Sequence, residues 1–289
     1  MSGILYLERL SPPDLALLAE AGGEPGTTAE RVARLRSDPG RIEALVASPA
    51  VFDALFGRGR REPVVLTAPF LAFAVLVAGT YRLLGEVSFV REWVGPERRV
   101  PVFDVVTLRE FLDDPLRRFF LSDLLASYTH VASGSVWVRT ARGWRRRRFS
   151  ELDPLRFAEL VEAVPEPERV ALYRRLGDVA LFLSGVFPDY AGRRLLTPVA
   201  VGRLKRVVGG SPPDGRGEEG PEGTGLELLE WLGRRSYRLA WEATHPRDVG
   251  LARVIGEVAD RFAHARRILN FLTEQYLFPY RERWLPGRG

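Results

Sequence analysis

The chain has 289 residues, of which 46% are hydrophobic and 27% are charged, and this balance of a folded globular protein excludes a chain that is disordered throughout. The 42 basic residues exceed the 37 acidic ones only slightly, so the net charge of +5 does not by itself indicate a nucleic-acid partner. The sequence has no cysteine, which excludes disulfides, thiolate nucleophiles and metal centres ligated by cysteine.

Residues 1–62 predict a string of short helices with clear start signals. Ser11 and Asp14 open an apolar stretch over residues 15–19, which ends at two glycines. Serine, threonine and aspartate accept hydrogen bonds from the first N–H groups of a helix, and proline fits the first turn. The same signals open three further helices, which end at Arg36, Ala47 and Phe56.

A long uncharged run follows at residues 63–81. Thr67 and Pro69 mark a helix start, so we expect a helix near residues 68–84. A membrane-spanning helix needs about 20 apolar residues, and this helix has polar residues in its last turns. We therefore expect a buried central helix rather than a membrane span.

Two short strands are predicted next, at residues 87–90 and 100–105, on either side of a Gly-Pro-Glu turn. Thr107 and Glu110 have the spacing of a capping box, which predicts a helix start at Thr107. Asp114, directly before a proline, predicts the start of another helix that runs to about residue 129.

The clearest β-hairpin signal covers residues 136–149, with a turn at Gly143. Its arginines occur within ten residues that contain no acid, and aromatic residues flank them. In a basic ribbon of this kind the arginines can contact phosphates and the aromatic rings can stack on bases. The alternative is an edge strand whose charges prevent aggregation and whose arginines pair with acidic residues of neighbouring helices. The predicted anion-binding residues are Arg139, Arg142, Arg145, Arg146, Arg147, Arg148 and Trp144.

The second half of the chain predicts four more helices. They cover residues 154–164, 169–186, 226–243 and 249–277, and the last has apolar residues at every third or fourth position. Residues 209–225 are rich in Gly, Pro and Glu without apolar periodicity, which predicts a loop or linker.

Asp178 lies in a helix that is apolar on nearly all sides. A buried carboxylate needs a hydrogen-bonding partner, because burying it alone is costly. We expect that partner to come from another helix, and His130 is one candidate. An Asp–His pair in a pocket would be a general-base candidate, while the alternative is a structural hydrogen bond that fixes the packing of helices.

Metal chemistry is not expected. Asp113 and Asp114 resemble a paired-carboxylate metal motif, but Arg117 occupies the position where a third carboxylate would be needed. Glu257 and Asp260 are accompanied by arginines at helical spacing, which predicts surface ion pairs. We predict no metal and no cofactor.

The segments Leu176-Gly-Asp178, Leu181-Phe182, Ser184-Gly185 and Phe187-Pro188, followed by Gly233-Arg-Arg-Ser-Tyr237, resemble a pattern found in uncharacterised bacterial helical proteins. The resemblance covers roughly residues 172–271. It implies a helical domain in this half of the chain and adds Tyr237 to the candidate residues, and it implies no established activity.

Together these signals predict a mainly α protein, a multi-helix globular bundle with a small antiparallel β element. We expect an N-terminal short-helix region (1–62), a central helical core with the hairpin (63–208), a flexible loop (209–225) and a C-terminal helical pair (226–289). No signal-peptide pattern is visible, which predicts a cytoplasmic protein.

The favoured function is a non-enzymatic interaction protein that binds an anionic partner, either a nucleic acid or an acidic protein surface. One alternative is a small-molecule-binding protein or enzyme, with Asp178, His130 and Tyr237 as candidate catalytic residues. Another is a helical subunit of a larger complex or of a homo-oligomer.

Overall fold

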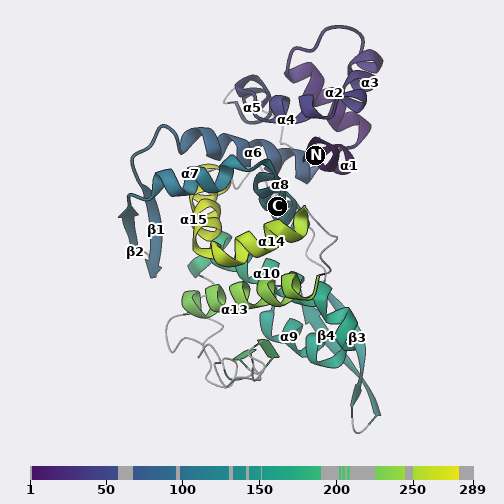
Figure 1. Ribbon diagram of the computed structural model, residues 1–289, viewed down its shortest axis with the longest axis vertical. Coiled ribbons are helices and arrows are strands. Elements are labelled where there is room, and N and C mark those ends of the chain that lie inside the picture. The colour runs from purple at the N-terminus through teal and green to yellow at the C-terminus, as the bar shows by residue number, and fades with distance from the viewer. Residues whose placement is uncertain are drawn as a thin grey trace, which may run out of the picture. The chain divides into compact units, whose positions relative to one another are not determined.

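The computed structural model describes residues 2–57, 68–95, 98–129, 152–189, 202, 204–205, 207–208, 225–244 and 250–279, and it describes the backbone alone at 133–140, 143–150, 156–157 and 167. The protein is mainly α-helical with two small antiparallel hairpins, as predicted (Figure 1). It forms two compact units. Unit 1 comprises Met1–Val90, Val102–Thr129 and Phe271–Gly289, and unit 2 comprises Arg91–Pro101 and His130–Asn270.

Each unit joins segments that are distant in the sequence. The division of the chain into four consecutive regions therefore stays a prediction, and the loop expected at 209–225 lies outside the described residues except for Gly225.

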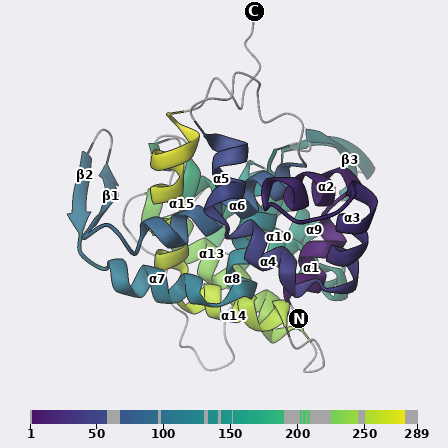
Figure 2. The ribbon, with the colours of Figure 1, turned by 90° about the horizontal axis from the view of Figure 1, so that it is seen from above.

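Unit 1 is built from short helices around one apolar helix. Helices α2 and α3 lie side by side in both ribbon views (Figures 1 and 2). The four predicted helices of residues 12–56 are confirmed, whereas the first helix was not anticipated. The helices are α1 (Ser2–Arg9), α2 (Pro12–Ala21), α3 (Thr28–Ser37), α4 (Gly40–Val46), α5 (Pro49–Phe56), α6 (Pro69–Leu83), α7 (Val105–Asp113) and α8 (Pro115–Ser127).

The start of α2 has a role beyond its own helix. Ser11 and Asp14 form a capping box, in which the Ser11 side chain accepts from the Asp14 N–H and the Asp14 side chain accepts from the Ser11 N–H at 2.9 Å. The other carboxylate oxygen of Asp14 accepts from the Ala68 N–H at 2.9 Å. Asp14, which is almost fully buried, therefore supplies a hydrogen bond at the N-terminus of α6, whose N-cap residue makes no side-chain cap of its own.

Helix α6 is the core of unit 1. Every residue from Phe70 to Thr80 is buried, as expected for a central helix that is apolar on all sides. The Thr80 hydroxyl donates to the Leu76 carbonyl at 2.9 Å, so the one polar side chain in this stretch is satisfied within the helix. Within the described part of the chain, no helix combines the length and the apolar composition that crossing a membrane requires.

The region after α6 corrects two predictions. The first hairpin is formed by β1 (Val90–Gly95) and β2 (Arg98–Val102), so the strands begin and end closer to the turn than predicted. Val105 begins helix α7 rather than ending a strand, and Thr107 lies inside the first turn. The capping box predicted at Thr107 was therefore wrong, because the helix starts two residues earlier.

Unit 2 is also built around one apolar helix. Helix α10 (Arg169–Val186) is buried continuously from Leu176 to Val186 and packs against α13 (Gly225–Glu242), which runs beside it in Figure 1. Helix α9 (Pro154–Ala163) packs on α10 and on the second hairpin. That hairpin consists of β3 (Ser133–Thr140) and β4 (Gly143–Ser150), which confirms the predicted β element.

The long helix predicted over residues 249–277 is broken into three parts. Helix α14 (Leu251–Asp260) ends at Arg261, α15 (Phe262–Leu272) follows directly, and a π-helical segment (Thr273–Leu277) completes the run. The apolar repeat continues across Arg261, so periodicity gave no sign of the break. The ring of Phe262 lies against Gly233 of α13, where a Cβ atom would come within 2.2 Å of it.

Candidate functional site

The β3–β4 hairpin pairs in antiparallel register, with Thr140 opposite Gly143 at the end next to the turn. The four consecutive arginines of β4 each lie opposite a residue that carries no negative charge. The pairs are Arg145 with Val138, Arg146 with Trp137, Arg147 with Val136 and Arg148 with Ser135. The hairpin therefore offers these arginines no acidic neighbour directly across the ribbon.

The register divides the hairpin into two faces, because alternate strand positions belong to opposite faces and directly paired residues share one. The Trp face, as we name it, has the register positions of both tryptophans and three arginines: Trp137, Arg139, Trp144, Arg146 and Arg148. The opposite face has Val136, Val138, Arg145, Arg147 and Phe149. All side chains of the hairpin lie outside the described residues, as do His130 and Arg142 altogether.

The surroundings of the hairpin carry both signs of charge. Helix α9 packs against β4 and bears Glu159 and Glu162, while Asp153 caps α9 by accepting from the Leu155 N–H at 3.1 Å. Residues 133–163 contain seven arginines and four acidic residues. Even with every acid of this segment paired to an arginine, the segment retains a positive charge.

The second candidate, Asp178, has its partner on another helix. The Tyr237 hydroxyl of α13 donates to Asp178 Oδ1 at 2.8 Å, and Arg175 approaches Asp178 Oδ2 at 3.9 Å. Asp178 is only 8% exposed and Tyr237 is completely buried. The structure thus brings together two of the three catalytic candidates, and the expected partner from another helix is Tyr237.

A glycine makes this pair possible. A Cβ atom on Gly177 would lie 2.5 Å from the ring of Tyr237, so only glycine lets that ring come this close to α10 beside Asp178. The pair lies at a close contact between the two central helices of unit 2. Its geometry is that of a structural hydrogen bond that fixes the packing of α13 on α10.

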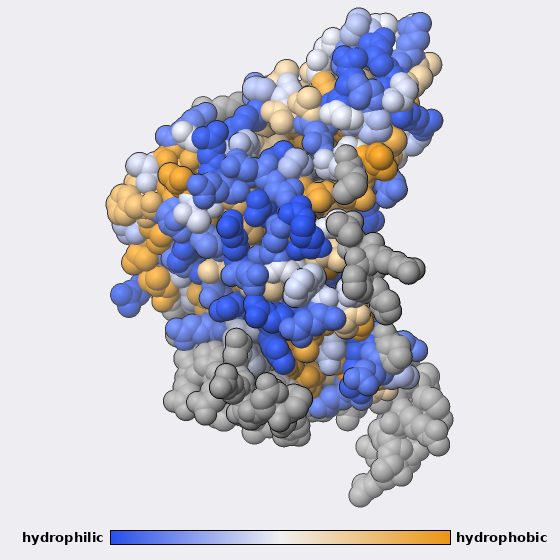
Figure 3. All heavy atoms as spheres, viewed as in Figure 1, coloured by the Kyte–Doolittle hydropathy of each residue, from blue (hydrophilic) through white to orange (hydrophobic). Residues whose placement is uncertain are grey.

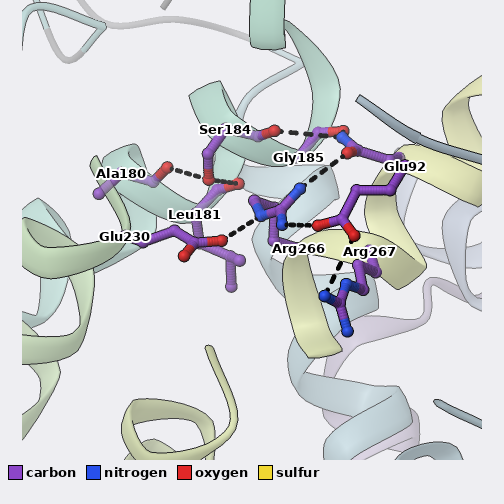
Figure 4. Close-up of polar contacts among 9 residues, drawn as sticks. Glu92, Ala180, Leu181, Ser184, Gly185, Glu230, Arg266 and Arg267 are labelled. Atoms are coloured by element: carbon purple, nitrogen blue, oxygen red, sulfur yellow. Dashed lines mark hydrogen bonds and ion pairs between the residues drawn. The ribbon is translucent and has the colours of Figure 1, made fainter. Parts of the chain in front are cut away.

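A buried ionic cluster in unit 2 was not anticipated from the sequence. Arg266 of α15 is 3% exposed and lies between two carboxylates (Figure 4). Its Nε donates to Glu230 of α13, and its terminal nitrogens donate to Glu92 of β1 and, at 3.3 Å, to Asn270. The neighbouring Arg267 pairs with the other oxygen of Glu92 at 3.1 Å. We call Glu92, Glu230, Arg266, Arg267 and Asn270 the Arg266 cluster.

The two arginines of the Arg266 cluster lower the pKa of Glu92. Burial raises the pKa of this carboxyl, but hydrogen bonds from Arg267 and Arg266, together with their charges, outweigh burial and hold its pKa below the ordinary value. Glu92 is therefore ionised at neutral pH, and the carboxylates of Glu92 and Glu230 together match the two guanidinium groups.

Asn270 extends the cluster to the backbone of α10. Its amide nitrogen donates to the carbonyls of Ser184, at 3.1 Å, and Gly185, so one side chain accepts from Arg266 and donates to the end of the core helix. The Ser184 hydroxyl turns back to the Ala180 carbonyl at 2.7 Å. A Cβ atom on Gly185 would lie 2.7 Å from the Cβ of Leu269, so this glycine permits the close approach of α15.

One sequence signal pointed to this cluster. Arg266 and Asn270 follow Phe262 at intervals of four residues, which places two polar side chains on the apolar side of a helix. The acidic partners give no such signal, because Glu92 and Glu230 are distant in the sequence. The cluster has its charges paired internally, and it ties β1, α10, α13 and α15 together.

Comparisons of the chain with protein-family models, with curated proteins and with solved structures give no match. The resemblance of residues 172–271 to bacterial helical proteins therefore stays an expectation.

Proposed function

We propose that the protein is a non-enzymatic interaction protein that binds nucleic acid through the β3–β4 hairpin. One observation carries the proposal: the register sets each of the four consecutive arginines of β4 opposite a residue without negative charge. This contrasts with Arg266, whose guanidinium group lies between two carboxylates.

The charge balance of the hairpin region favours a polyanion. Seven arginines against four acids in residues 133–163 leave an excess positive charge on one small element, although the whole chain is only mildly basic. A guanidinium group matches phosphate oxygens in a bidentate manner, and affinity for nucleic acid rests largely on such contacts.

The tryptophans favour a nucleic acid over an acidic protein surface. The Trp face combines Trp137 and Trp144 with three arginine positions. Aromatic rings provide stacking platforms for unpaired bases, worth about 1–3 kcal/mol per base, while arginines contact the backbone phosphates. Single-stranded segments are therefore the expected ligands. The opposite face, with two valines and Phe149, has the composition of a face that packs on a helix, and α9 is the neighbour of β4.

The test compares two matched variants in fluorescence anisotropy with labelled single- and double-stranded DNA and RNA across a salt series. R146Q/R148Q removes two charges from the Trp face, and R145Q/R147Q removes two from the opposite face. We expect wild-type affinity to fall steeply with salt. R146Q/R148Q should weaken binding and flatten the logarithmic salt slope for single strands by about 1.4, since each lost phosphate contact removes about 0.7.

The control variant R145Q/R147Q is expected to retain most of the affinity and of the slope. Equal losses in both variants would assign binding to the overall charge of the hairpin rather than to the Trp face. Absence of binding by the wild-type chain at low salt would overturn the proposal, and binding to polyglutamate instead would point to an acidic protein partner.

A further inference from the structure

Unit 1 exposes an apolar patch next to α7. Phe103 is 75% exposed, Val106 is 72% exposed and Phe89 is 41% exposed, and the rings of Phe89 and Phe103 lie with their centroids 5.9 Å apart. In Figure 3, hydrophobic residues gather in the region where Figure 1 labels α7. Large apolar side chains that cluster on a surface usually mark a place where something binds.

A hollow of about 450 Å³ lies beside this patch, between α7 and the end of α6. Its apolar lining consists of Leu84, Val87, Val105 and Val106. Pockets of about 300–1,000 Å³ hold small organic ligands, so a hollow of this volume has ample room for one phenyl ring. Val106 belongs both to the wall of the hollow and to the exposed patch.

We propose that this surface binds a second copy of the chain, with Phe103 of each copy entering the α7 hollow of the other. A two-fold interface requires one surface that is complementary to itself, because each residue contact occurs twice. Here an exposed Phe103 and a hollow of suitable size, which has an apolar wall and a charged rim, occur on the same surface, with Phe103 only three residues before Val106 of that wall.

The charged rim of the hollow is also self-complementary. Arg109 is exposed and lies with its guanidinium carbon 5.2 Å from the centre of the Tyr81 ring. Glu110 and Asp113 are exposed within the next turn of α7, and Asp113 accepts from the Tyr81 hydroxyl at 2.8 Å. Two copies that pair with antiparallel α7 helices can set Arg109 of one against Glu110 or Asp113 of the other.

The same rim argues against other macromolecular occupants. Two acids and one arginine at the edge of the hollow disfavour a nucleic acid or an anionic membrane surface. The apolar centre consists of a few side chains, whereas a standard interface buries about 800 Å² on each partner, so we expect a weak dimer with a dissociation constant in about the micromolar range.

The test is sedimentation equilibrium of the full chain between about 1 µM and about 500 µM, a range chosen to span a micromolar dissociation constant. We expect the average molar mass of the wild-type chain to rise from 32.4 kDa toward twice that value as the concentration increases. F103D should remain monomeric throughout. I4D is the matched control, because Ile4 is 53% exposed on α1, which packs on α4 and α8, and this variant should associate like the wild type.

A charge-exchange experiment gives a second, independent readout. R109E alone and D113R alone should each associate more weakly than the wild type, because each leaves like charges on both sides of the interface. An equimolar mixture of the two should recover association, since opposite charges then face each other. A wild-type chain that stays monomeric at every concentration, or F103D that dimerises like the wild type, would overturn the proposal.

Discussion

The Arg266 cluster and the β3–β4 hairpin place arginines opposite different kinds of residue. Arg266 is buried between Glu92 and Glu230, and its neighbour Arg267 also binds Glu92. The hairpin arginines of β4 instead lie opposite valine, tryptophan and serine. An arginine that meets carboxylates of its own chain holds helices and strands together, whereas the run of arginines without acids across the ribbon is the feature from which we propose nucleic-acid binding.

The largest expected effect comes from breaking the internal pairing. Arg266→Ala removes the cation shared by two half-buried carboxylates, of which Glu92 keeps Arg267 as a partner, and this should lower the free energy of unfolding by roughly 3 kcal/mol. Urea denaturation measures this loss. The control is Arg253→Ala, which removes an exposed pair with Glu257 and should cost less than about 1 kcal/mol. Equal losses in both variants would show that the Arg266 cluster does not hold unit 2 together.

The next effect concerns the hydrogen bond between Tyr237 and Asp178. Tyr237→Phe removes the donor at 2.8 Å from a carboxylate that is almost fully buried, so unfolding should become easier by about 1–3 kcal/mol. Tyr81→Phe is a matched control, because the Tyr81 hydroxyl donates to Asp113 over the same distance at the surface, and its loss should cost well under about 1 kcal/mol. Thermal unfolding of both variants distinguishes a buried structural bond from an exposed one.

The pH dependence of stability tests Glu92. Its pKa is lowered in the folded state, so the stabilisation it provides is present above the pKa of an unfolded glutamate and is lost as the pH falls through the lowered folded value. We expect wild-type stability to decline below about pH 4. In Glu92→Gln this part of the decline should be absent, which urea denaturation at a series of pH values would measure. An unchanged acid profile in the variant would contradict the assignment.

The smallest expected effect on stability comes from removing two charges of the hairpin. R146Q/R148Q should weaken nucleic-acid binding but change the free energy of unfolding by no more than about 0.5 kcal/mol, because we propose that these arginines contact an external ligand rather than acids of the chain. A loss as large as that of Arg266→Ala would mean that the hairpin arginines pair with acids of the chain, such as Glu159 and Glu162. The two regions would then no longer differ.

Several helix starts were predictable because their signals are local. Ser11 and Asp114 act as N-caps where the sequence indicated, and α10 has the predicted bounds. The two wrong predictions of helix boundaries also rested on local signals. Thr107 and Glu110 have the spacing of a capping box, yet they lie within α7, and an unbroken apolar repeat concealed the break at Arg261. In both cases the spacing is compatible with more than one helix boundary.

The sequence by itself determined the helical class, the two apolar core helices and the basic hairpin, because caps, periodicity and charge runs depend on neighbours within a few residues. Only the tertiary structure decided which polar groups meet. Arg266 and Glu92 are 174 positions apart and Asp178 and Tyr237 are 59 apart, so no spacing rule could pair them. The cost of burying an unpaired charge requires a partner for each group, but it does not specify which residue supplies that partner. The close packing of α13 and α15 on α10, which Gly177 and Gly185 permit, determines which residues become partners.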